Sequence, residues 1–496
     1  MPATHAQTHS VARTETEGHT LVLDIGKSHA KLLLFDAAGE VRMRCVQANA
    51  PTEAEEGYTA LGTAALEAWL MRTLPDLPGR DRERIGRIGI TTHGAAFCAL
   101  GDEGLALPPI DYEWDGYGPW RERYAEQVDG FEITGSPFLP QGLNAGLQLW
   151  WLQQTQPQAW AQVRHWVPYP QYWAWWFTGQ RASEATSLGC HTHLWQPHRQ
   201  VYAPWAMRSG LVQRFAPLRP AHAVLGTVRP ARARALGLSP SCQVHVGLHD
   251  SNACLARHLQ ASPQATVVST GTWTVVMRAG QDVGARLSLD PRRDELFNQS
   301  IDGRAVPTAR FMGGREFAFL CHGADPALAT LPALREALDA GWQVWPDKPE
   351  DADAVPGRAA ALQQGTQRWG RAPEVVPAHW RPALAAWYAA VLTAQNVQRL
   401  CPVPSNEPNN EPVIVEGPMA DNAAFTAALA AVLAPRPVLR STDAVEGTAR
   451  GTWLSTRWQQ PDALLRYAPV PPPEAADRQA LQQAWRRWRD QGTRCG

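Results

Sequence analysis

LVLDIGKSHAKLLLFD, residues Leu21 to Asp36, decides the fold of this chain, because two apolar runs flank a short polar turn. The runs predict two paired β-strands. The polar residues in and beside the turn are Asp24, Gly26, Lys27, Ser28 and Lys31. A glycine lets the backbone approach an anion, a lysine balances negative charge, and a carboxylate can hold a hydrated metal ion. The stretch predicts a phosphate-binding clasp, and a hairpin with a solvated turn is the alternative.

Lysine is rare in this chain, and its placement favours the clasp. The sequence contains 46 lysine and arginine residues together, but lysine occurs only at Lys27, Lys31 and Lys348. Two of the three lysines therefore lie in one turn. Lysine binds phosphate as a compact point charge, a role that arginine does not simply replace, so the turn looks selective for that chemistry.

Length, charge and cysteine usage indicate a multidomain protein that acts on small molecules. The chain has 496 residues, of which 44% are apolar, and a formal net charge of -1. These values suit two or more domains and give no basis for binding nucleic acid or an anionic membrane. The eight cysteines are dispersed without a C-x-x-C pair, which argues against a zinc ribbon or a disulfide scaffold. Residues 1–18 contain no apolar segment, and no later run approaches the roughly 20 apolar residues of a membrane span. We expect a disordered leader and a cytoplasmic protein.

The segments after the opening hairpin continue an α/β pattern. Glu53–Leu74 has the apolar spacing of a helix, and Arg84–Leu100 is a β-type run. Ligands of α/β folds are met at strand ends and their loops. This run contains the sequence TTHG, so its His93 and Gly94 are candidate ligand contacts. A structural imidazole is the alternative for His93.

Two loops present polar and aromatic side chains together. The first, Leu107–Trp120, carries Asp111, Trp114, Asp115 and Tyr117. Aromatic faces stack on the C–H faces of a polyol, and carboxylates accept hydrogen bonds from its hydroxyls. We therefore expect this loop to contact a polyol, with a packed surface loop as the alternative. A second such loop, Gln141 to Asn144, precedes a predicted helix.

Two further clusters have mainly structural interpretations. Seven of the 22 tryptophans are Trp150, Trp151, Trp160, Trp166, Trp173, Trp175 and Trp176. Such clusters can stack sugars or bases, but at helical spacing we expect core packing. Cys190, His191 and His193 contain metal-ligating atoms, but they do not have the paired spacing of a structural zinc site. We do not expect zinc there.

Asp250 lies where a predicted strand gives way to a predicted helix, within Ala231–Leu259. Asp is a preferred helix N-cap, which is the structural interpretation of this position. The functional interpretation is a general base that faces a ligand beyond the sheet.

The stretch Ala265–Gly280 repeats the plan of the opening stretch. Two β-rich runs flank a turn of small residues, Ser269 to Thr272. The chain thus holds two phosphate-type hairpins, each of which opens a predicted α/β domain.

The second half of the chain contains further turns and helices. Gly313 and Gly314 form a turn, Trp345–Arg358 is a predicted surface loop, and a helix is expected from about Ala378 to Leu400. The segment PVIVEGPMADNAAFTAALAAVL then predicts a strand, a glycine turn and a helix, a unit that can receive a nucleotide. DAVEGTARGTWLSTRW predicts a small-residue helix, and an amphipathic helix ends the chain.

Four motifs in this order resemble those of the FGGY carbohydrate kinases, members of the actin-like ATPase superfamily. DIGKSHAK resembles the first phosphate motif, GLHDSNA the catalytic motif, STGTW the second phosphate motif, and VEGPMADN with VEGTARG the adenosine motifs. The resemblance spans roughly Leu21 to Leu454. It implies two actin-like (ribonuclease H-like) α/β domains, residues 19–250 and 251–496, with a nucleotide and sugar cleft between them.

The resemblance also implies roles for individual residues, with ATP and Mg²⁺ as cofactors. Asp250 would take the proton from a sugar hydroxyl as it attacks the γ-phosphoryl group, and Asp24 would help to hold Mg²⁺ through water. The candidate nucleotide contacts are Asp24, Gly26, Lys27, Ser28, Lys31, Thr270, Gly271, Thr272, Gly313, Gly314, Gly417 and Asn422. The candidate sugar contacts are His93, Gly94, Trp114, Asp115, Gln141, Asn144 and His249.

The chain departs from the family pattern at three places. Lys27 begins the turn that is rich in Thr and Ser in many relatives, the arginine that often follows Asp115 is missing, and Glu416 replaces a glycine. These differences put the identity of the substrate in doubt more than the activity.

The expected substrate is a small ketose. STGTW is similar to the turn of kinases that act on rhamnulose and fuculose, and TTHG resembles the xylulose branch. A deoxyketohexose such as L-rhamnulose or L-fuculose, or a pentulose such as xylulose, is therefore predicted. The alternatives are an actin-like nucleotide-binding regulator without kinase activity and a kinase of a carboxylate or a non-sugar polyol. The sequence does not determine whether the protein forms a homodimer.

Overall fold

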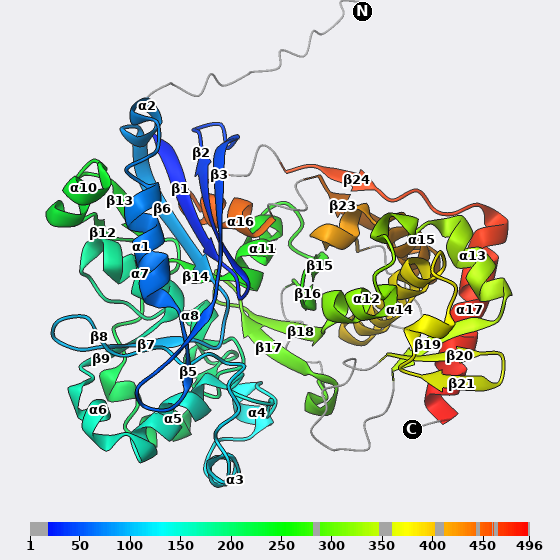
Figure 1. Ribbon diagram of the computed structural model, residues 1–496, viewed down its shortest axis with the longest axis horizontal. Helices are drawn as coiled ribbons and strands as arrows, with labels where there is room; N and C mark the ends of the chain where they lie inside the picture. The colour runs from blue at the N-terminus through cyan, green and yellow to red at the C-terminus, as the bar shows by residue number, and fades with distance from the viewer. Residues whose placement is uncertain are drawn as a thin grey trace, which may run out of the picture.

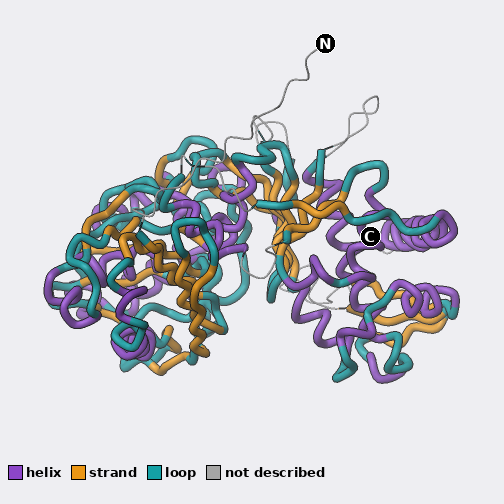
Figure 2. The backbone as a smooth tube through the Cα atoms, turned by 90° about the horizontal axis from the view of Figure 1, so that it is seen from above, coloured by secondary structure: helices purple, strands orange, loops and turns teal. Residues whose placement is uncertain are grey.

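The computed structural model describes residues 18–280, 288–346, 360–401, 411–442, 447–458, 460 and 465–494. In this part of the chain, two lobes lie side by side, each built around a seven-stranded mixed sheet (Figures 1 and 2). This architecture confirms the predicted α/β class of two actin-like domains. The predicted leader lies almost entirely outside the described residues, as do most of the expected loop from Trp345 to Arg358 and part of the second adenosine motif.

The first sheet is built on the opening hairpin. Its strands, in spatial order, are β12 (Val224–Thr227), β13 (Gln243–His245), β6 (Ile85–Thr92), β1 (His19–Ile25), β2 (His29–Phe35) and β3 (Val41–Ala48), with β14 (Leu248–His249) also paired to β6. Strands β1 and β2 are antiparallel, and β6 runs parallel to β1. The predicted hairpin is confirmed.

The apolar runs of β1 and β2 are continuous because both faces of the sheet are covered. Leu21 and Leu23 pack with helices α1 (Thr63–Thr73) and α7 (Tyr169–Thr178). Val22, between them, packs with Trp453 of helix α16 (Gly447–Ser455) on the opposite face. Successive strand residues therefore face different helical layers.

The second sheet repeats this plan. Its order is β17 (Glu295–Gln299), β18 (Ala305–Phe311), β16 (Thr274–Arg278), β15 (Thr266–Thr270), β22 (Val413–Glu416), β23 (Val438–Ser441) and β24 (Tyr467–Pro469). Strands β15 and β16 form an antiparallel hairpin, and β22 runs parallel to β15. The second predicted hairpin is therefore also confirmed. The helices of this lobe are α12 (Gly313–Cys321), α13 (Leu331–Asp339), α14 (Arg381–Leu400), α15 (Ala423–Leu433) and α17 (Ala475–Arg494). Its short 3-10 turns are η3 (Pro291–Arg293), which precedes β17, and η4 (Pro326–Leu328), η5 (Pro373–Val375) and η6 (Pro418–Asp421), which lie between the helices.

Two helices lie between the sheets and join the lobes (Figure 1). Helix α11 (Asp250–Leu259) follows β14 of the first lobe and packs against β15 of the second. Helix α16 comes late in the sequence but packs on β1 and β6 of the first sheet and on α11. A Cβ at Gly451 would collide with the carbonyl oxygen of Ala253, so glycine permits this close approach of the two helices.

A layer of short elements closes the lower part of the first lobe (Figure 1). The elements labelled there in Figure 1 are α3 (Trp120–Ala125), α4 (Phe131–Thr134), α5 (Ala145–Thr155), α6 (Pro157–Gln162), β5 (Thr59–Leu61), β7 (Phe97–Leu100), β8 (Leu105–Leu107) and β9 (His165–Pro168). Helix α2 (Gly79–Arg82) lies at the top of the lobe and α10 (Pro230–Leu236) at its upper left (Figure 1). The remaining short elements of this lobe are α8 (Ala185–Leu188), α9 (Pro204–Arg208), η1 (Val212–Arg214), β4 (Pro51–Glu53), β10 (Trp195–Gln196) and β11 (Val201–Tyr202). The second lobe has a further small sheet of β19 (Trp342–Pro346), β20 (Ala360–Gln364) and β21 (Gln367–Gly370). The seven clustered tryptophans pack in or against the apolar cores, as predicted, and line neither of the two cavities described below.

Two expectations about local structure are wrong in detail. The helix expected over Glu53–Leu74 begins only at Thr63, because the preceding residues form the hairpin of β4 and β5. Tyr58 is buried in that hairpin's turn and packs edge-on against Trp151, so its apolar character reflects core packing rather than a helix face. The run Arg84–Leu100 is two strands in different sheets, since β6 ends at Thr92 and β7 begins at Phe97.

Candidate active site

A cavity of about 430 Å³ lies between the lobes and is lined from both. The first lobe contributes the turn between β1 and β2, the segment after β6 and the start of α11. The second contributes the turn between β15 and β16, strands β17 and β18, and the segment after β22. The lining includes Asp24, Gly26, Lys27, Ser28, Lys31, His93, Gly94, His249, Asp250, Thr270, Gly271, Thr272 and Gly417. These thirteen predicted site residues are thus brought together.

The first hairpin presents charged groups to the cavity. The ammonium of Lys31 lies 3.7 Å from Asp24 Oδ2, and the two residues are directly opposite each other in the strand pair. The turn itself is closed by a hydrogen bond of 2.9 Å from the amide of Gly26 to the carbonyl oxygen of His29. A carboxylate beside an ammonium, at a tight glycine turn, is a donor set that suits a hydrated cation and phosphate oxygens.

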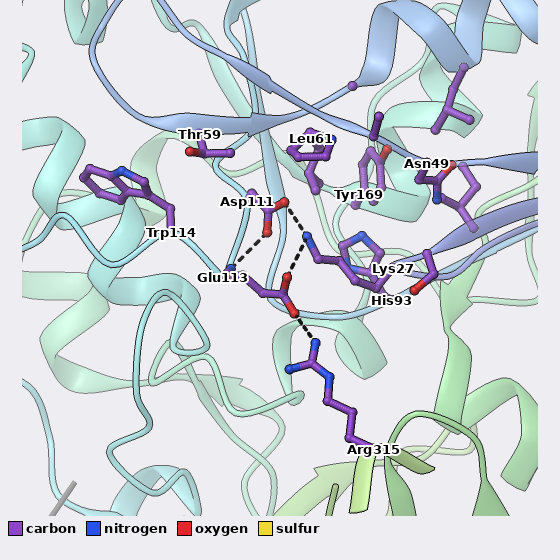
Figure 3. A pocket seen from close by; sticks show the side chains of 16 residues that line it. Lys27, Asn49, Thr59, Leu61, His93, Asp111, Glu113, Trp114, Tyr169 and Arg315 are labelled. Carbon is purple, nitrogen blue, oxygen red and sulfur yellow. Dashed lines mark hydrogen bonds and ion pairs between the residues drawn. The ribbon is translucent and has the colours of Figure 1, made fainter. Parts of the chain in front are cut away.

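Lys27 faces the other way, toward a second cavity of about 350 Å³ that adjoins the first (Figure 3). Its ammonium pairs with Asp111 and lies 3.6 Å from Glu113 Oε2. Glu113 in turn accepts a hydrogen bond of 2.7 Å from Arg315 of the second lobe. A chain of alternating charges therefore crosses between the lobes beside the cavity.

The second hairpin presents backbone and hydroxyl groups instead. Gly271 and Thr272 are exposed at the turn, and the hydroxyl of Thr270 donates to the carbonyl oxygen of Glu416 at 2.6 Å. Gly417 has φ +84°, and a Cβ there would collide with Thr270. A Cβ at Gly314 would likewise collide with the carbonyl of Gly271. Glycines at both contacts let neighbouring segments brace this turn closely.

Asp250 is the first residue of α11 and lines the same cavity. Its Oδ1 accepts from the backbone amide of Ser251 at 2.6 Å and lies 3.1 Å from His249 Nε2. The predicted junction between a strand and a helix is confirmed. His249, not Asp250, occupies the N-cap position, so capping does not account for this aspartate.

His93 and Gly94 lie where β6 ends. His93 Nδ1 donates to the carbonyl oxygen of Gly94 at 2.9 Å, and burial lowers the pKa of His93, so the neutral ring keeps Nε2 as an acceptor. A Cβ at Gly94 would meet Cys190 and His249. His93 lines both cavities.

Other predicted sugar contacts lie elsewhere. Trp114 lines the smaller cavity but packs edge-on with Tyr117 and Trp151, and Asp115 is exposed and lines neither cavity. Gln141 and Asn144 also line neither cavity. The Asn144 amide instead fixes loops, since it accepts from the amide of Leu139 at 2.7 Å and donates to the carbonyl of His191 at 2.8 Å.

Two predicted nucleotide contacts have structural roles. Asn422 caps α15 by accepting from the amide of Phe425 at 2.9 Å. Gly313 lies against Thr274, with which a Cβ would collide, and it lines neither cavity.

The structure adds residues that the candidate set omits. From the first lobe these are Asp111, Tyr112 and Glu113, and from the second Asn298, Arg310 and Arg315. Asp111, Glu113 and Asp115 are every second residue of the loop, and this polar pattern indicates that the loop contacts a ligand. Which of the carboxylates face the cavity depends on the path of the loop. Arg310 of β18 lies over the ring of Trp273 and pairs at 3.0 Å with Asp294, the residue before β17, and no local pattern indicates either contact.

The Cys190 cluster does not converge on one point. His191 donates to the carbonyl of Leu143 at 2.6 Å, whereas His193 contacts Tyr124 and Ser136. Within the described residues, one other set, Cys254, His258 and Glu416, brings metal-ligating atoms within 4.8 Å of one another. His258 Nε2 and Glu416 Oε1 are already joined at 2.7 Å, with Arg257 beside them, so the set is explained as a buried hydrogen-bonded pair. The seven described cysteines are unpaired thiols.

Comparison with known proteins follows the same division into lobes. Residues 19–256 match the N-terminal domain of the FGGY family of carbohydrate kinases, and residues 262–463 match "Carbohydrate kinase FGGY, C-terminal domain". A search of curated protein sequences gives no match. The crystal structure of a carbohydrate kinase from Novosphingobium aromaticivorans is 34% identical, with a TM-score of 0.79, over 96% of this chain and 98% of that chain.

More distant structures share the fold alone. A ligand-bound xylulose kinase from Lactobacillus acidophilus is 12% identical, with a TM-score of 0.75, over 95% of this chain and 97% of that chain. A glycerol kinase from Plasmodium falciparum with ADP is 11% identical, with a TM-score of 0.71, over 95% and 98%.

The chain belongs to the FGGY family of carbohydrate kinases. It is therefore an enzyme, a kinase that acts on small molecules, and the alternative of a regulator without kinase activity is set aside. Among the described residues, no helix has both the length and the apolar character that a membrane span requires.

Proposed function

We propose that this enzyme transfers the γ-phosphoryl group of ATP to a hydroxyl group of a neutral ketose, with Asp250 as the general base. One observation carries the proposal: Asp250 and the turns of both hairpins line a single cavity between the lobes. Phosphoryl transfer needs mainly alignment and charge neutralisation, plus a base for the hydroxyl proton.

The residues of the cavity suit ATP and Mg²⁺. Asp24 and Lys31 form the charged side, and the exposed backbone of Gly271 and Thr272 forms the opposite side. Asp24 would hold Mg²⁺ through water, and the bound ion supplies neutralisation of phosphate charge. Lys31 orients and neutralises the phosphates, and the glycine-braced turn receives them with backbone amides. Closure of the two lobes around the phosphates would exclude water from this region.

We place the sugar beside Lys27, Arg310 and Arg315, and the ion pairs of these cations support a neutral substrate. Each cation there is paired with a carboxylate: Lys27 with Asp111 and Glu113, Arg310 with Asp294, and Arg315 with Glu113. An acceptor with its own carboxylate would bring a further negative charge beside these paired carboxylates, whereas hydroxyl groups can bond to both members of a pair. This favours a sugar such as L-rhamnulose, L-fuculose or xylulose over an aldonate.

The proton path uses the free side of Asp250. Its Oδ1 already accepts hydrogen bonds, which leaves Oδ2 to take the proton of the attacking hydroxyl group. His93 Nε2 is an acceptor for another hydroxyl of the sugar and helps to orient it.

A coupled assay of ADP release tests the substrate class. Ketoses, aldoses, glycerol and gluconate are each added to enzyme, ATP and Mg²⁺, and we expect at least one ketose to raise the rate at least about tenfold. A mock preparation from cells that do not express the protein, purified identically, controls for contaminating kinases. Best stimulation by gluconate or glycerol, or no stimulation at all, would contradict the proposal.

Location and assembly stay predictions. We propose a cytoplasmic enzyme on the basis of its class, the FGGY carbohydrate kinases. Light scattering of the purified protein determines whether it is a monomer or a homodimer.

A further inference from the structure

His249 was predicted to contact the sugar, but its ring is engaged on both sides by protein groups. Nδ1 lies 3.0 Å from the side-chain nitrogen of Asn252. Nε2 lies 3.1 Å from Asp250 Oδ1 and 3.2 Å from Cys190 Sγ. The side chain of His249 is 7% exposed, and its ring lies against Gly94, where any Cβ would crowd it.

The partners of the ring select one tautomer. The Asn252 amide nitrogen can only donate, so Nδ1 must carry the lone pair. In a neutral imidazole the proton is then on Nε2, which points at a carboxylate oxygen. The opposite arrangement, with the Asn252 amide reversed, would set the lone pair of Nε2 against Asp250 Oδ1, and the repulsion disfavours it.

The surroundings keep this ring neutral. Burial lowers the pKa of His249, and Arg310 from β18 lowers it further, against the opposing effect of Asp250. Five other titratable groups face His249 and Asp250. They are His93 and Tyr112 from the first lobe, Cys190 and His191 after α8, and Cys254 on α11. Burial lowers the pKa of both other histidines and raises the pKa of both thiols and the phenol, so none of them adds charge near neutral pH.

Asp250 is consequently held in an asymmetric way. Oδ1 accepts hydrogen bonds from the backbone amide of Ser251 at 2.6 Å, from the hydroxyl of Ser251 at 3.3 Å and from the N–H of His249. Among the described residues, no group donates to Oδ2. Hydrogen bonds to the charged form stabilise it and reduce the basicity of the oxygen that accepts them.

We propose that His249 is a positioning residue, locked by Asn252 as the Nε2–H tautomer, which fixes the carboxylate of Asp250 so that Oδ2 takes the acceptor proton. The inference rests on the proposed role of Asp250 as the base. It replaces the predicted contact between His249 and the sugar. Asn252, a buried residue in the first turn of α11, acts one step further from the reaction.

The kinetic test compares two substitutions of His249 with wild type, using whichever ketose gives the fastest ADP release. His249→Phe removes the donor, and we expect kcat to fall about 10- to 100-fold with the KM for ATP unchanged. Because the ionised carboxylate loses a donor, the acidic limb of the kcat/KM profile moves to higher pH by about one unit. His249→Gln keeps a donor near the position of Nε2, and we expect kcat within about threefold of wild type and an acidic limb in its original place.

His245→Phe is the matched control. This histidine is also buried, donates to the carbonyl of His222 at 2.8 Å and lines neither cavity. Its replacement removes an equal ring without touching Asp250, so the acidic limb stays in place. If His249→Phe instead raises the KM for the sugar with the acidic limb unmoved, His249 is a substrate contact and the inference is wrong.

A second measurement needs no known sugar and reads the tautomer in the wild-type protein. Imidazole ¹⁵N NMR of the histidine-labelled full chain, assigned by the signal lost in His249→Gln, should show a neutral Nε2–H ring above pH 6. An Nδ1–H tautomer or an imidazolium would overturn the inference.

The outcome for Asp250→Asn separates the two levels of the argument. Loss of turnover in that variant, together with an unmoved acidic limb in His249→Phe, rejects only the role of His249. Retained turnover in Asp250→Asn rejects the proposed base itself.

Discussion

The two hairpins that line the cavity have the same topology and different chemistry. The first hairpin carries Lys27 in its turn and Lys31 at the start of β2, both with carboxylate partners, whereas the turn between β15 and β16 carries no charged residue and is braced by Gly314 and Gly417. We infer that the first hairpin contacts the phosphates through charged side chains and the second through the backbone of a closely packed turn. A repeated fold therefore does not imply a repeated function for its turns.

The two lysines of the first hairpin also differ from each other. Lys31 pairs with Asp24 across the strand pair, and Lys27 pairs with Asp111 at the smaller cavity, where we place the sugar. If the first hairpin contacts both substrates, as we propose, substitutions of Lys27 and Lys31 should give different kinetic phenotypes.

Removal of Lys31 should have the largest effect of the variants that probe this comparison. Lys31→Ala takes the cation from the phosphate side, and we expect kcat/KM for ATP to fall about 100-fold, as for loss of one preorganised group that stabilises charge. Steady-state kinetics with varied ATP measures the effect. Unchanged ATP kinetics would show that the first hairpin does not bind phosphate through this residue.

Crowding the second hairpin should have the next largest effect. Gly417→Ala places a Cβ against Thr270 at φ +84°, and we expect the free energy of unfolding to fall by about 2–4 kcal/mol and the KM for ATP to rise about tenfold. Denaturant unfolding and ATP kinetics measure the two effects.

Gly365→Ala is the control for that variant. Gly365 has φ +56° with no atom near its Cβ position, so only backbone strain of about 1 kcal/mol is expected, with ATP kinetics unchanged. Equal behaviour of the two variants would show that the contact with Thr270 does not shape the turn.

Removal of Lys27 should have the smallest effect, and on the other substrate. Lys27→Met keeps the length of the side chain but releases Asp111 and Glu113, and we expect the KM for the sugar to rise about fivefold with the KM for ATP unchanged. If the KM for ATP rises instead, Lys27 belongs to the phosphate side and the division between the two lysines is wrong.

The sequence predicts the framework well because its signals are local. The continuous apolar runs of both hairpins, and the position of Asp250 between a strand and a helix, depend only on neighbouring residues. The helix expected from Glu53 is wrong because Tyr58 is buried against Trp151, a distant partner.

The acceptor side could be predicted only in part, since it depends on loop paths and on contacts between the lobes. The loop after β8 was identified, but it directs Asp111 and Glu113 to the cavity rather than Asp115. Arg310 lines the larger cavity and Arg315 lines both cavities. Both come from elements more than 190 residues later in the chain than Asp111 and Glu113, and no local pattern joins them to that loop.

The most direct test of the central claim is ³¹P NMR of enzyme, ATP, Mg²⁺ and the best ketose from the ADP-release assay. The account predicts a sugar phosphate signal that grows in step with ADP for wild type and is at least about 1000-fold slower for Asp250→Asn, which still binds ATP. Free phosphate in place of sugar phosphate, or product formation by Asp250→Asn at the wild-type rate, would contradict it.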